Sequence, residues 1–515
     1  MMTPITRWKA IEAPSPGLRA MKHRFMISAA HKSSGKTTLS VGLCGALHAR
    51  GLSVQPFKKG PDYIDPIWLT QASGRACRNL DLYLMTPQEI GHTFQRFSRP
   101  AEVALVEGNK GLYDGLALDG SNSNAALAKQ LDLPVVLVLD ARGMTRGIAP
   151  LILGYQAFDR DIRFAGVILN QLGGARHESK LRHVIEHYTD VPVLGALPHD
   201  PDLFVAERHL GLVPGNETPQ ALGLIQQLSR RIEQHIDLAR LLEGTRCPPV
   251  TPFPLQTDPA STGAAPPNTT EQTWSRTAPG RVLPDHPPLR IAIARDQVFG
   301  FYYADDLEAL EAAGAQLVPF NTLTDRALPE VDGLYIGGGF PEAFAPALAA
   351  NAPLRAHLHR VIAAGLPTYA ECGGLMYLAR SLRTLDGQEH PMVGVIPGQV
   401  LMHARPVGRG YVHLAEQEQH PWPRPRAPAQ HIRAHEFHYS SLEGLPPDTR
   451  FAYRVLRGYG IDGHQDGLLI HHVLASYTHL RTIGECTWAN RFVAFIRQHA
   501  ATRYNAAFVE EGARA

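Results

Sequence analysis

Residues 25–38 read FMISAAHKSSGKTT, a short apolar run followed by a loop of small residues and Lys-Thr-Thr. The apolar part predicts a buried strand, and the residues after Gly35 continue as a helix. A loop in this context is a phosphate loop, because backbone N–H groups and a helix N-terminus cradle phosphate. We expect Lys36 to reach the β and γ oxygens of a nucleotide and Thr37 to ligate Mg²⁺. Ala30 stands where the usual pattern has its first glycine. The predicted nucleotide-binding residues are Ser33, Ser34, Gly35, Lys36, Thr37 and Thr38.

A second loop carries two carboxylates. Residues 58–66 read KKGPDYIDP, in which two prolines and a glycine restrict the backbone around Asp62 and Asp65. Carboxylates held in this way can bind a metal ion or orient a substrate. Alone, the pattern is more often a capped turn, and the neighbouring phosphate loop is what favours a site.

A third segment, EGNKGLYDG at 107–115, directly follows the apolar strand expected at 103–106. An acid at the carboxyl end of a strand beside a phosphate loop is where a nucleotide-bound Mg²⁺ finds a carboxylate. We therefore expect Glu107 to share the metal ion with Thr37. Asp114, like the two acids of the second loop, would position substrate or metal, and the sequence does not separate these roles.

The chain divides at a proline-rich segment. Its 515 residues suffice for two or three domains, and residues 248–288 hold 11 of the 41 prolines with little apolar periodicity. On both sides, short apolar strands alternate with helical stretches, which predicts parallel sheets covered on both faces. The expected fold class is α/β, with a phosphate-loop parallel-sheet domain followed by a second α/β domain. The expected boundaries are an extension at 1–22, domains at 23–245 and 290–515, and a linker at 246–289.

Composition narrows the classes of function. Lys and Arg total 50 against 48 Asp and Glu, and a net charge of +2 is too near zero to favour nucleic acid as a partner. No run approaches the ~18 consecutive apolar residues of a membrane-spanning helix, and the first residues lack the apolar stretch of a secretory signal. We therefore expect a cytoplasmic protein without a membrane partner. The five cysteines are scattered, so neither a disulfide framework nor a zinc site is indicated.

The C-terminal half contains a candidate nucleophile. Residues 367–378, PTYAECGGLMYL, predict a strand, a tight turn and a helix, a context that projects Cys372 from the sheet edge and favours its thiolate. Upstream, IGGGFPE at 336–342 also follows a strand, and its N–H groups predict an oxyanion hole. The oxyanion residues would be Gly337, Gly338 and Gly339. A base is also required, and the histidines to weigh are His435, His438, His471, His472 and His479.

Taken together, these motifs resemble the cobyrinate a,c-diamide synthase family, the glutamine-dependent tetrapyrrole amidases of corrinoid biosynthesis, including their sirohaem amidase relatives. The similarity covers nearly the whole chain outside the N-terminal extension and the linker. Its motifs are SSGKTT, GPDYIDP, NLD at 79–81, EGxxGLYDG, GVILN at 166–170, ERHLGL at 207–212, ARDxxFxFYY at 294–303, GGGFPE, ECGGLMYL, HEFHYS at 435–440 and ASYxHL at 475–480.

The resemblance implies a dethiobiotin-synthetase-like ATP domain fused to a class I glutamine amidotransferase domain, with Cys372 as nucleophile and His479 as catalytic histidine. Arg481 stands where many triad amidotransferases carry a carboxylate, so the group that orients His479 is left open. The implied enzyme is a carbon–nitrogen ligase. It would use glutamine, ATP and Mg²⁺ to amidate the a and c carboxylates of a cobyrinate-type tetrapyrrole through an acyl phosphate.

Two alternatives are open. Asn109 and Lys110 stand where corrinoid enzymes tend to carry apolar residues, and this pair is similar to sirohaem amidases. Lys110 is therefore a candidate contact to the carboxylate rim of the substrate, and sirohaem is the alternative macrocycle. A remote alternative is a phosphate-loop switch ATPase with a non-catalytic C-terminal domain. The sequence does not separate cobyrinate from hydrogenobyrinate, fix the order of the two amidations, decide whether the chain forms a homodimer, or assign a role to the linker.

Overall fold

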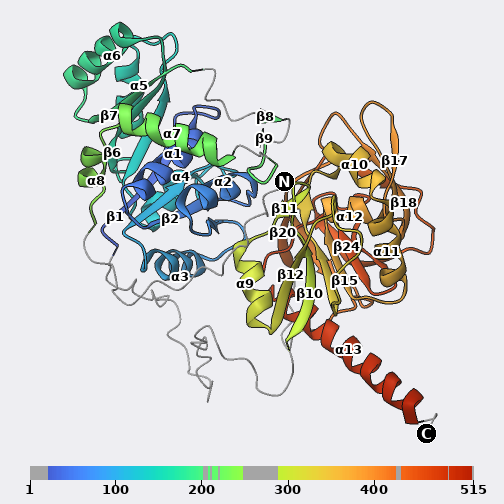
Figure 1. Cartoon of the computed structure of the whole chain (residues 1–515). Helices are drawn as coiled ribbons and strands as arrows, with labels where there is room; N and C mark the ends of the chain where they lie inside the picture. The colour runs from blue at the N-terminus through green and yellow to red at the C-terminus, as the bar shows by residue number, and fades with distance from the viewer. Residues whose placement is uncertain are drawn as a thin grey trace, which may run out of the picture.

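The computed structural model describes residues 21–200, 207–208, 211–217, 221–247, 288–424, 431–484 and 486–512. Most of the extension and of the linker lies outside these residues. In the N-terminal half, seven parallel strands form one sheet in the order β3-β2-β4-β1-β5-β6-β7 (Figure 1). Their bounds are β1 His23–Ala29, β2 Val54–Lys59, β3 Arg78–Leu80, β4 Val103–Glu107, β5 Val135–Asp140, β6 Phe164–Leu172 and β7 Val193–Pro198.

Helices cover both faces of this sheet, so alternate residues of each strand enter different apolar cores. In β1, Phe25 and Ile27 belong to one apolar cluster and Met26 to the other. A strand buried on both faces reads as a continuous apolar run, which is the signal that the sequence carries. The helices are α1 Lys36–Ala49, α2 Ile64–Ser73, α3 Pro87–Ser98, α4 Asn124–Gln130, α5 Ile148–Phe158, α6 Ala175–Tyr188, α7 Ala221–His235 and α8 Leu238–Gly244, and a small ribbon pairs β8 Glu207–Arg208 with β9 Gly211–Leu212.

The C-terminal half has a nine-stranded sheet in the order β12-β10-β13-β15-β24-β23-β22-β19-β20. The first five strands are parallel, as expected, and the remaining four run antiparallel, an extension of the sheet that the sequence did not predict. The chain turns from β23 to β24 between Ile470 and Val473, too tightly for the crossover that a parallel pair requires. The bounds are β10 Leu289–Ala294, β12 Ala315–Phe320, β13 Gly333–Ile336, β15 Thr368–Glu371, β19 Gly408–Glu416, β20 Ile432–His438, β22 Arg450–Arg457, β23 Gln465–Ile470 and β24 Val473–Ser476.

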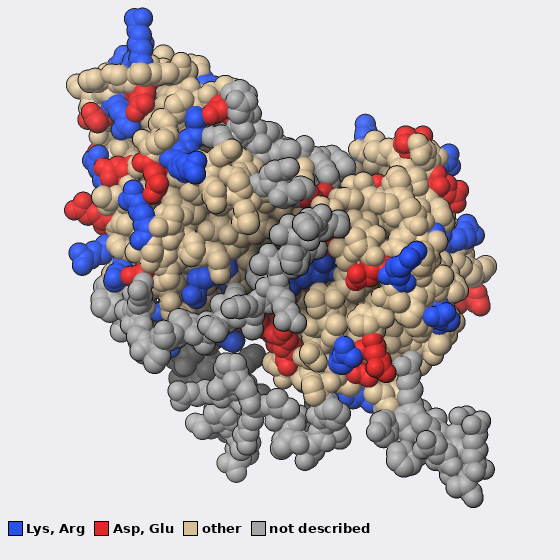
Figure 2. Space-filling view, in the orientation of Figure 1, with Lys and Arg blue, Asp and Glu red and all other residues tan. Residues whose placement is uncertain are grey.

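Smaller elements complete this half. A four-stranded sheet joins β17 Glu389–Pro391, β16 Ala379–Arg383, β18 Ile396–Met402 and β21 Ser440–Glu443, and β11 Phe299–Phe301 pairs with β14 Gly338–Gly339. The helices are α9 Ala304–Ala312, the 3₁₀ helix η2 Pro341–Phe344, α10 Ala345–Ala350, α11 Ala352–Ala363, α12 Gly373–Leu378 and α13 Trp488–Gly512. Within the described residues no helix is both long and apolar enough to cross a membrane. Basic and acidic side chains are interspersed over both halves on the face drawn in Figure 2.

An ion network built on two buried arginines, Arg78 and Arg481, joins the two halves, which lie side by side in Figure 1. Arg78 of β3 donates to Asp305 at 2.7 Å and also contacts Glu308, both on α9. Arg481, 1% exposed, donates to the same Asp305 at 2.8 Å and to the backbone carbonyl of Asn79 at 2.7 Å. These bonds hold the end of β3 against the segment that follows β24, so the carboxyl ends of both sheets meet at the interface.

Gly374→Ala is expected to destabilise the C-terminal domain. A Cβ at Gly374, in α12, would lie 2.2 Å from the carbonyl oxygen of Ile336 in β13, so the helix and the strand would have to separate. Overpacking of this kind lowers the free energy of unfolding by about 1–3 kcal/mol, which calorimetry would record as a lower melting temperature.

Gly154→Ala is the matched control, because a Cβ there meets no atom of the described chain within 4 Å. Alanine favours the interior of α5 by about 1 kcal/mol over glycine, so the melting temperature should hold or rise. Equal melting temperatures for Gly374→Ala and the parent protein would contradict the packing described for α12.

Candidate active sites

The phosphate loop lies between β1 and α1, as the sequence predicts. Gly35 has φ +87°, and a Cβ on it would lie 2.2 Å from Nδ2 of Asn170, which donates to the carbonyl of Ser34 at 2.9 Å. Only glycine fits this position. Ser33 also has a positive φ of 63°, and Thr38 is half-buried in the first turn of α1. Asn170 therefore shapes the loop from strand β6, which is separated from β1 by β5 in the sheet, a contact that the loop sequence does not reveal.

Thr37 brings the two acidic segments together. Its hydroxyl is 2.6 Å from Oε1 of Glu107 and 3.2 Å from Oδ2 of Asp65. Lys36, 8% exposed, lies beside them, and burial lowers its pKa to about 8, with the charge of Lys58 adding to the effect. Asp62 turns back to accept the N–H of Ile64 at 2.8 Å.

Lys58 is the residue at this site that sequence reasoning missed. Its ammonium is 2.5 Å from Asp65, 3.0 Å from Glu107 and 3.8 Å from Asp62, and its side chain is 4% exposed. Burial alone would lower the pKa of Lys58, but the charges of Asp65 and Glu107 outweigh it and raise the pKa. The sequence did hold a signal for the role of Lys58, because this lysine lies in the buried strand β2, which ends beside the phosphate loop.

The donor set at Thr37 fits Mg²⁺. Three carboxylates surround the ammonium of Lys58, and Oε2 of Glu107 is buried with no hydrogen-bond partner among the described residues. In the part of the chain that is described, no three His, Cys, Asp or Glu side chains form a metal site by themselves. A divalent ion here would therefore rely on the Thr37 hydroxyl and on nucleotide phosphates as well, which is the usual coordination of Mg²⁺.

The segment after Glu107 borders this site and is largely exposed. Asp114 accepts the N–H of Gly111 at 2.9 Å, and Lys110 is exposed with φ 43°. The buried lysine of the region is Lys59, which donates to Asn109 at 3.1 Å and to the carbonyl of Asn122 at 2.7 Å. Burial lowers the pKa of Lys59 to about 8.

Cys372 forms a strained turn between β15 and α12. Its φ is 48° and its side chain is 7% exposed, in line with the strand-turn-helix prediction. The glycine loop lies against this turn, because a Cβ on Gly373 would lie 2.9 Å from the backbone nitrogen of Gly339. The N–H of Gly337 already donates to the hydroxyl of Tyr302 at 3.0 Å.

His479 is the candidate histidine that reaches Cys372. It is 3% exposed, and its Cε1 would lie 2.7 Å from a Cβ on Gly338. Burial opposes the charged form of His479, but its interactions with the neighbouring Cys372 and Glu371 outweigh burial and raise its pKa to about 10. Its Nδ1 lies 3.6 Å from Oε2 of Glu371, a second residue that the sequence did not assign.

Of the other candidate histidines, His435 lies beside His479, while His471 and His472 lie at the far end of β24. His435 stacks on His479 with ring centroids 5.0 Å apart, and burial lowers its pKa well below the ordinary value. His438 stacks on Tyr477 at 3.9 Å. His471 and His472 lie in the turn between β23 and β24, at the other end of β24 from His479, and His472 contacts the carbonyl of Gly365 at 2.9 Å.

Tyr63 connects the two centres. It sits between Asp62 and Asp65 in sequence, is 8% exposed, and stacks on Phe301 with ring centroids 5.5 Å apart. The same ring lies 5.1 Å from the ring of His479. One short loop therefore supplies carboxylates to the phosphate site and an aromatic contact to the histidine beside Cys372.

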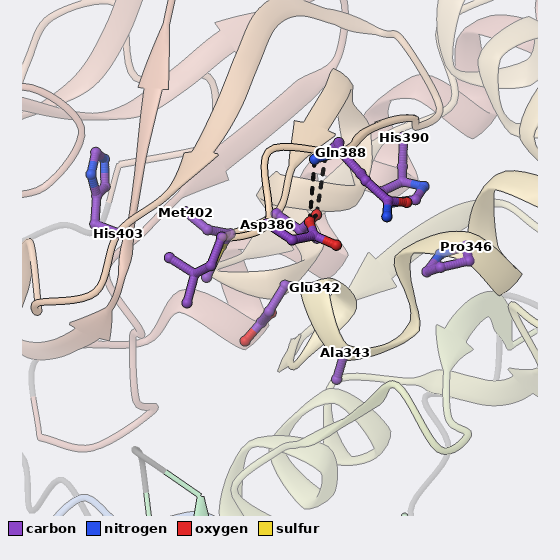
Figure 3. A pocket seen from close by; sticks show the side chains of 10 residues that line it. Glu342, Ala343, Pro346, Asp386, Gln388, His390, Met402 and His403 are labelled. Carbon is purple, nitrogen blue, oxygen red and sulfur yellow. Dashed lines mark hydrogen bonds between the residues drawn. The ribbon is translucent and has the colours of Figure 1, made fainter.

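A separate surface depression of about 490 Å³ lies on the C-terminal half. Figure 3 shows Glu342, three residues after the glycine loop, among its lining residues with Met402 and His403. Asp386 on its wall accepts hydrogen bonds from Thr384 and Gln388. Its lining includes neither Cys372 nor a residue of the phosphate loop.

Comparisons with known proteins find a different family in each half of the chain. Residues 23–206 match a family described as an AAA domain, and residues 290–485 match a CobB/CobQ-like glutamine amidotransferase domain. A solved structure titled "Crystal structure of glutamine amidotransferase" is 16% identical and covers 40% of this chain and 98% of its own, with a TM-score of 0.29. The family matches confirm the expected order of the two domains.

Curated relatives extend over nearly the whole chain. The cobyrinate a,c-diamide synthase of Magnetococcus marinus is 43% identical, covering 92% of this chain and 97% of the relative. Those of Methanosarcina acetivorans and Archaeoglobus fulgidus are each 40% identical, covering 93% and 91% of this chain and 96% of each relative. At this identity and coverage, the chain belongs to the cobyrinate a,c-diamide synthase family.

Proposed function

We propose that this protein amidates the a and c carboxylates of cobyrinate, using ATP and ammonia released from glutamine. The observation that carries the proposal is the junction at Tyr63, where the loop bearing Asp62 and Asp65 packs against the histidine beside Cys372. Near-full-length relatives named cobyrinate a,c-diamide synthase favour cobyrinate over sirohaem as the macrocycle. A switch ATPase would not account for the amidotransferase match at residues 290–485.

In the C-terminal domain, the sulfur of Cys372 attacks the side-chain amide carbon of glutamine. Its proton passes to His479 and then to the departing nitrogen, so the carbon–nitrogen bond breaks and ammonia leaves. The backbone N–H groups of Gly338 and Gly339 are the candidates to stabilise the oxyanion, since that of Gly337 is already bonded to Tyr302. Water then hydrolyses the glutamyl thioester and regenerates the thiol.

In the N-terminal domain, a substrate carboxylate attacks the γ-phosphate of ATP and ADP departs. Ammonia then displaces phosphate from the acyl phosphate and forms the amide. Lys36 and Lys58 supply positive charge where the phosphoryl group transfers. Mg²⁺ fits the oxygen donors of Thr37 and Glu107 and would neutralise phosphate charge there. Asp62, Asp65 and Asp114 are proposed to contact substrate or metal.

The proposed domains are 23–245 and 290–515. Their shared interface also serves the chemistry, because free ammonia is protonated in neutral water and lost as a nucleophile. Tyr83 and His413 share a hydrogen bond of 2.7 Å, and Tyr411 donates to Asp81 at 2.9 Å, so further bonds besides the contact of Tyr63 join the two domains. A cytoplasmic location and a homodimer stay predictions.

Cys372→Ala is expected to abolish glutamine-dependent amidation and to keep amidation with a high concentration of ammonium salt at raised pH. Only ammonia supply requires the thiol. The measurement is mass spectrometry of the corrinoid product with each nitrogen source. Cys486→Ala, which also lies in the C-terminal half, should keep both activities. Loss of both activities by Cys372→Ala, with circular dichroism unchanged, would contradict this division of labour.

Glu107→Gln is expected to lower turnover by about 100-fold while nucleotide still binds, because one charge at the phosphoryl-transfer site is lost. ATP hydrolysis and nucleotide binding would be measured as Mg²⁺ is varied. Glu102→Gln is the matched control, since Glu102 is 5% exposed at the opposite end of β4 and pairs with Lys22 at 2.9 Å. Parent-like turnover of Glu107→Gln at limiting Mg²⁺ would rule out the role.

Lys110→Met is expected to raise KM for cobyrinate by about 10-fold, as loss of ~1.4 kcal/mol of binding implies, with a smaller change in KM for ATP. The physical reason is an exposed ammonium facing a polyanionic rim. Lys129→Met removes an exposed ammonium that pairs with Asp159 at 2.7 Å and should change neither constant. An unchanged KM for cobyrinate would exclude Lys110 from substrate binding.

A further inference from the structure

The residue two places after His479 does not orient it. Arg481 points into the domain interface, where it bonds to Asp305 and to the carbonyl of Asn79, and its guanidinium lies 4.9 Å from the centre of the Tyr303 ring. A cation also disfavours the charged imidazole. Arg481 is therefore committed to joining the domains.

A carboxylate approaches His479 from another strand. Glu371 ends β15, immediately before Cys372, and is 1% exposed. Because β15 lies beside β24, the chain that follows β24 passes Glu371, and Oε2 of this side chain comes 3.6 Å from Nδ1 of His479. That Nδ1 has no hydrogen-bond partner among the described residues, so Glu371 is the acceptor that faces it.

Three neutral donors fix the carboxylate in place. Oε1 of Glu371 accepts the Tyr369 hydroxyl at 2.5 Å and the N–H of Leu480 at 3.0 Å, and Oε2 accepts the Tyr335 hydroxyl at 3.1 Å. These bonds satisfy a buried carboxylate without adding a positive charge to neutralise it. A buried charge needs a partner of opposite sign, and the imidazole in contact is the group that can supply one.

We propose that Glu371 is the positioning residue of the Cys372–His479 pair and replaces the carboxylate that other amidotransferases carry after the histidine. It would hold the proton on Nδ1 and leave Nε2 for the thiol and the departing ammonia. The bond to Leu480 ties the same carboxylate to the backbone next to His479, so ring and carboxylate are positioned together. This inference rests on the proposed glutaminase role of Cys372.

The electrostatics of the pocket agree with this geometry. The raised pKa of His479 depends on Glu371 as well as on Cys372. The other titratable groups around the imidazole are His435 and Tyr63, with Tyr303 against His435 and Asp306 and Arg481 close by. Losing the Glu371 charge should therefore make the imidazolium, and with it the thiolate–imidazolium pair, less stable.

The test compares two readouts in Glu371→Gln. Glutamine-dependent kcat should fall by about 10- to 100-fold, while ammonia-dependent amidation stays near the parent rate. The pH at which iodoacetamide alkylation of Cys372 reaches its half-maximal rate should rise by about 1 unit, followed by mass spectrometry of the Cys372 peptide. A merely structural role would lower both amidation rates together and leave the alkylation midpoint in place, and that result would overturn the proposal.

Glu436→Gln is the matched control, because Glu436 is a 2% exposed carboxylate that lies 3.6 Å from His438. In Glu436→Gln, the pH of half-maximal Cys372 alkylation should equal that of the parent protein. If Glu371→Gln loses ammonia-dependent activity and does not fold, Glu371→Asp is the second variant. It keeps the negative charge but moves it away from Nδ1 of His479. An unchanged pH of half-maximal Cys372 alkylation in Glu371→Asp overturns the proposal. If Cys372→Ala keeps glutamine-dependent amidation, the proposed function itself fails, whatever Glu371 does.

Discussion

The ammonium of Lys58 holds together the acidic surroundings of the phosphate loop. Asp65 and Glu107 lie within 3.0 Å of it, and without its charge these two carboxylates would repel one another in a buried setting. The loop from Gly60 to Pro66 is anchored on this ion cluster, and the anchored loop in turn presents Tyr63 to the C-terminal domain. The position of one buried cation thus sets both the shape of the phosphate site and one of the places where the domains touch.

The ion network at Asp305 serves orientation more than stability. Desolvation of buried charges offsets most of their attraction, whereas removing one partner of such a pair costs about 3–5 kcal/mol. Asp305 accepts from Arg78 of one domain and Arg481 of the other, both nearly inaccessible to water. An apolar interface would tolerate sliding, but these directional bonds fix which strand ends face each other. The role of Arg481 is therefore structural, because it joins the two domains through Asp305 and the carbonyl of Asn79.

The sequence predicted what local pattern encodes: the phosphate loop, the strand-turn-helix around Cys372, and α/β halves with continuous apolar strands. It missed what depends on contacts between distant segments. Lys58 reads as an ordinary strand-end lysine until Glu107, 49 residues away, is placed beside it. Glu371 reads as a neighbour of the nucleophile until β24 pairs with β15 and brings His479 to it. The antiparallel part of the second sheet was missed because polar residues interrupt its strands, as in GRGYVHLAE and IRAHEFH, so they lack the continuous apolar runs of the parallel strands.

The place of Tyr63 in sequence has a thermodynamic consequence. Its backbone continues directly into Asp62 and Asp65, and its ring rests against His479. Any ligand that shifts this loop must change the surroundings of His479. Because linkage is reciprocal, a ligand that binds beside His479 and is coupled to the loop changes the affinity of the loop for its own ligand by the same factor. Hydrolysis of glutamine or ATP is wasted when either reaction runs alone. The loop around Tyr63 is common to both centres, so a conformational change of this loop at one centre also changes the contacts at the other.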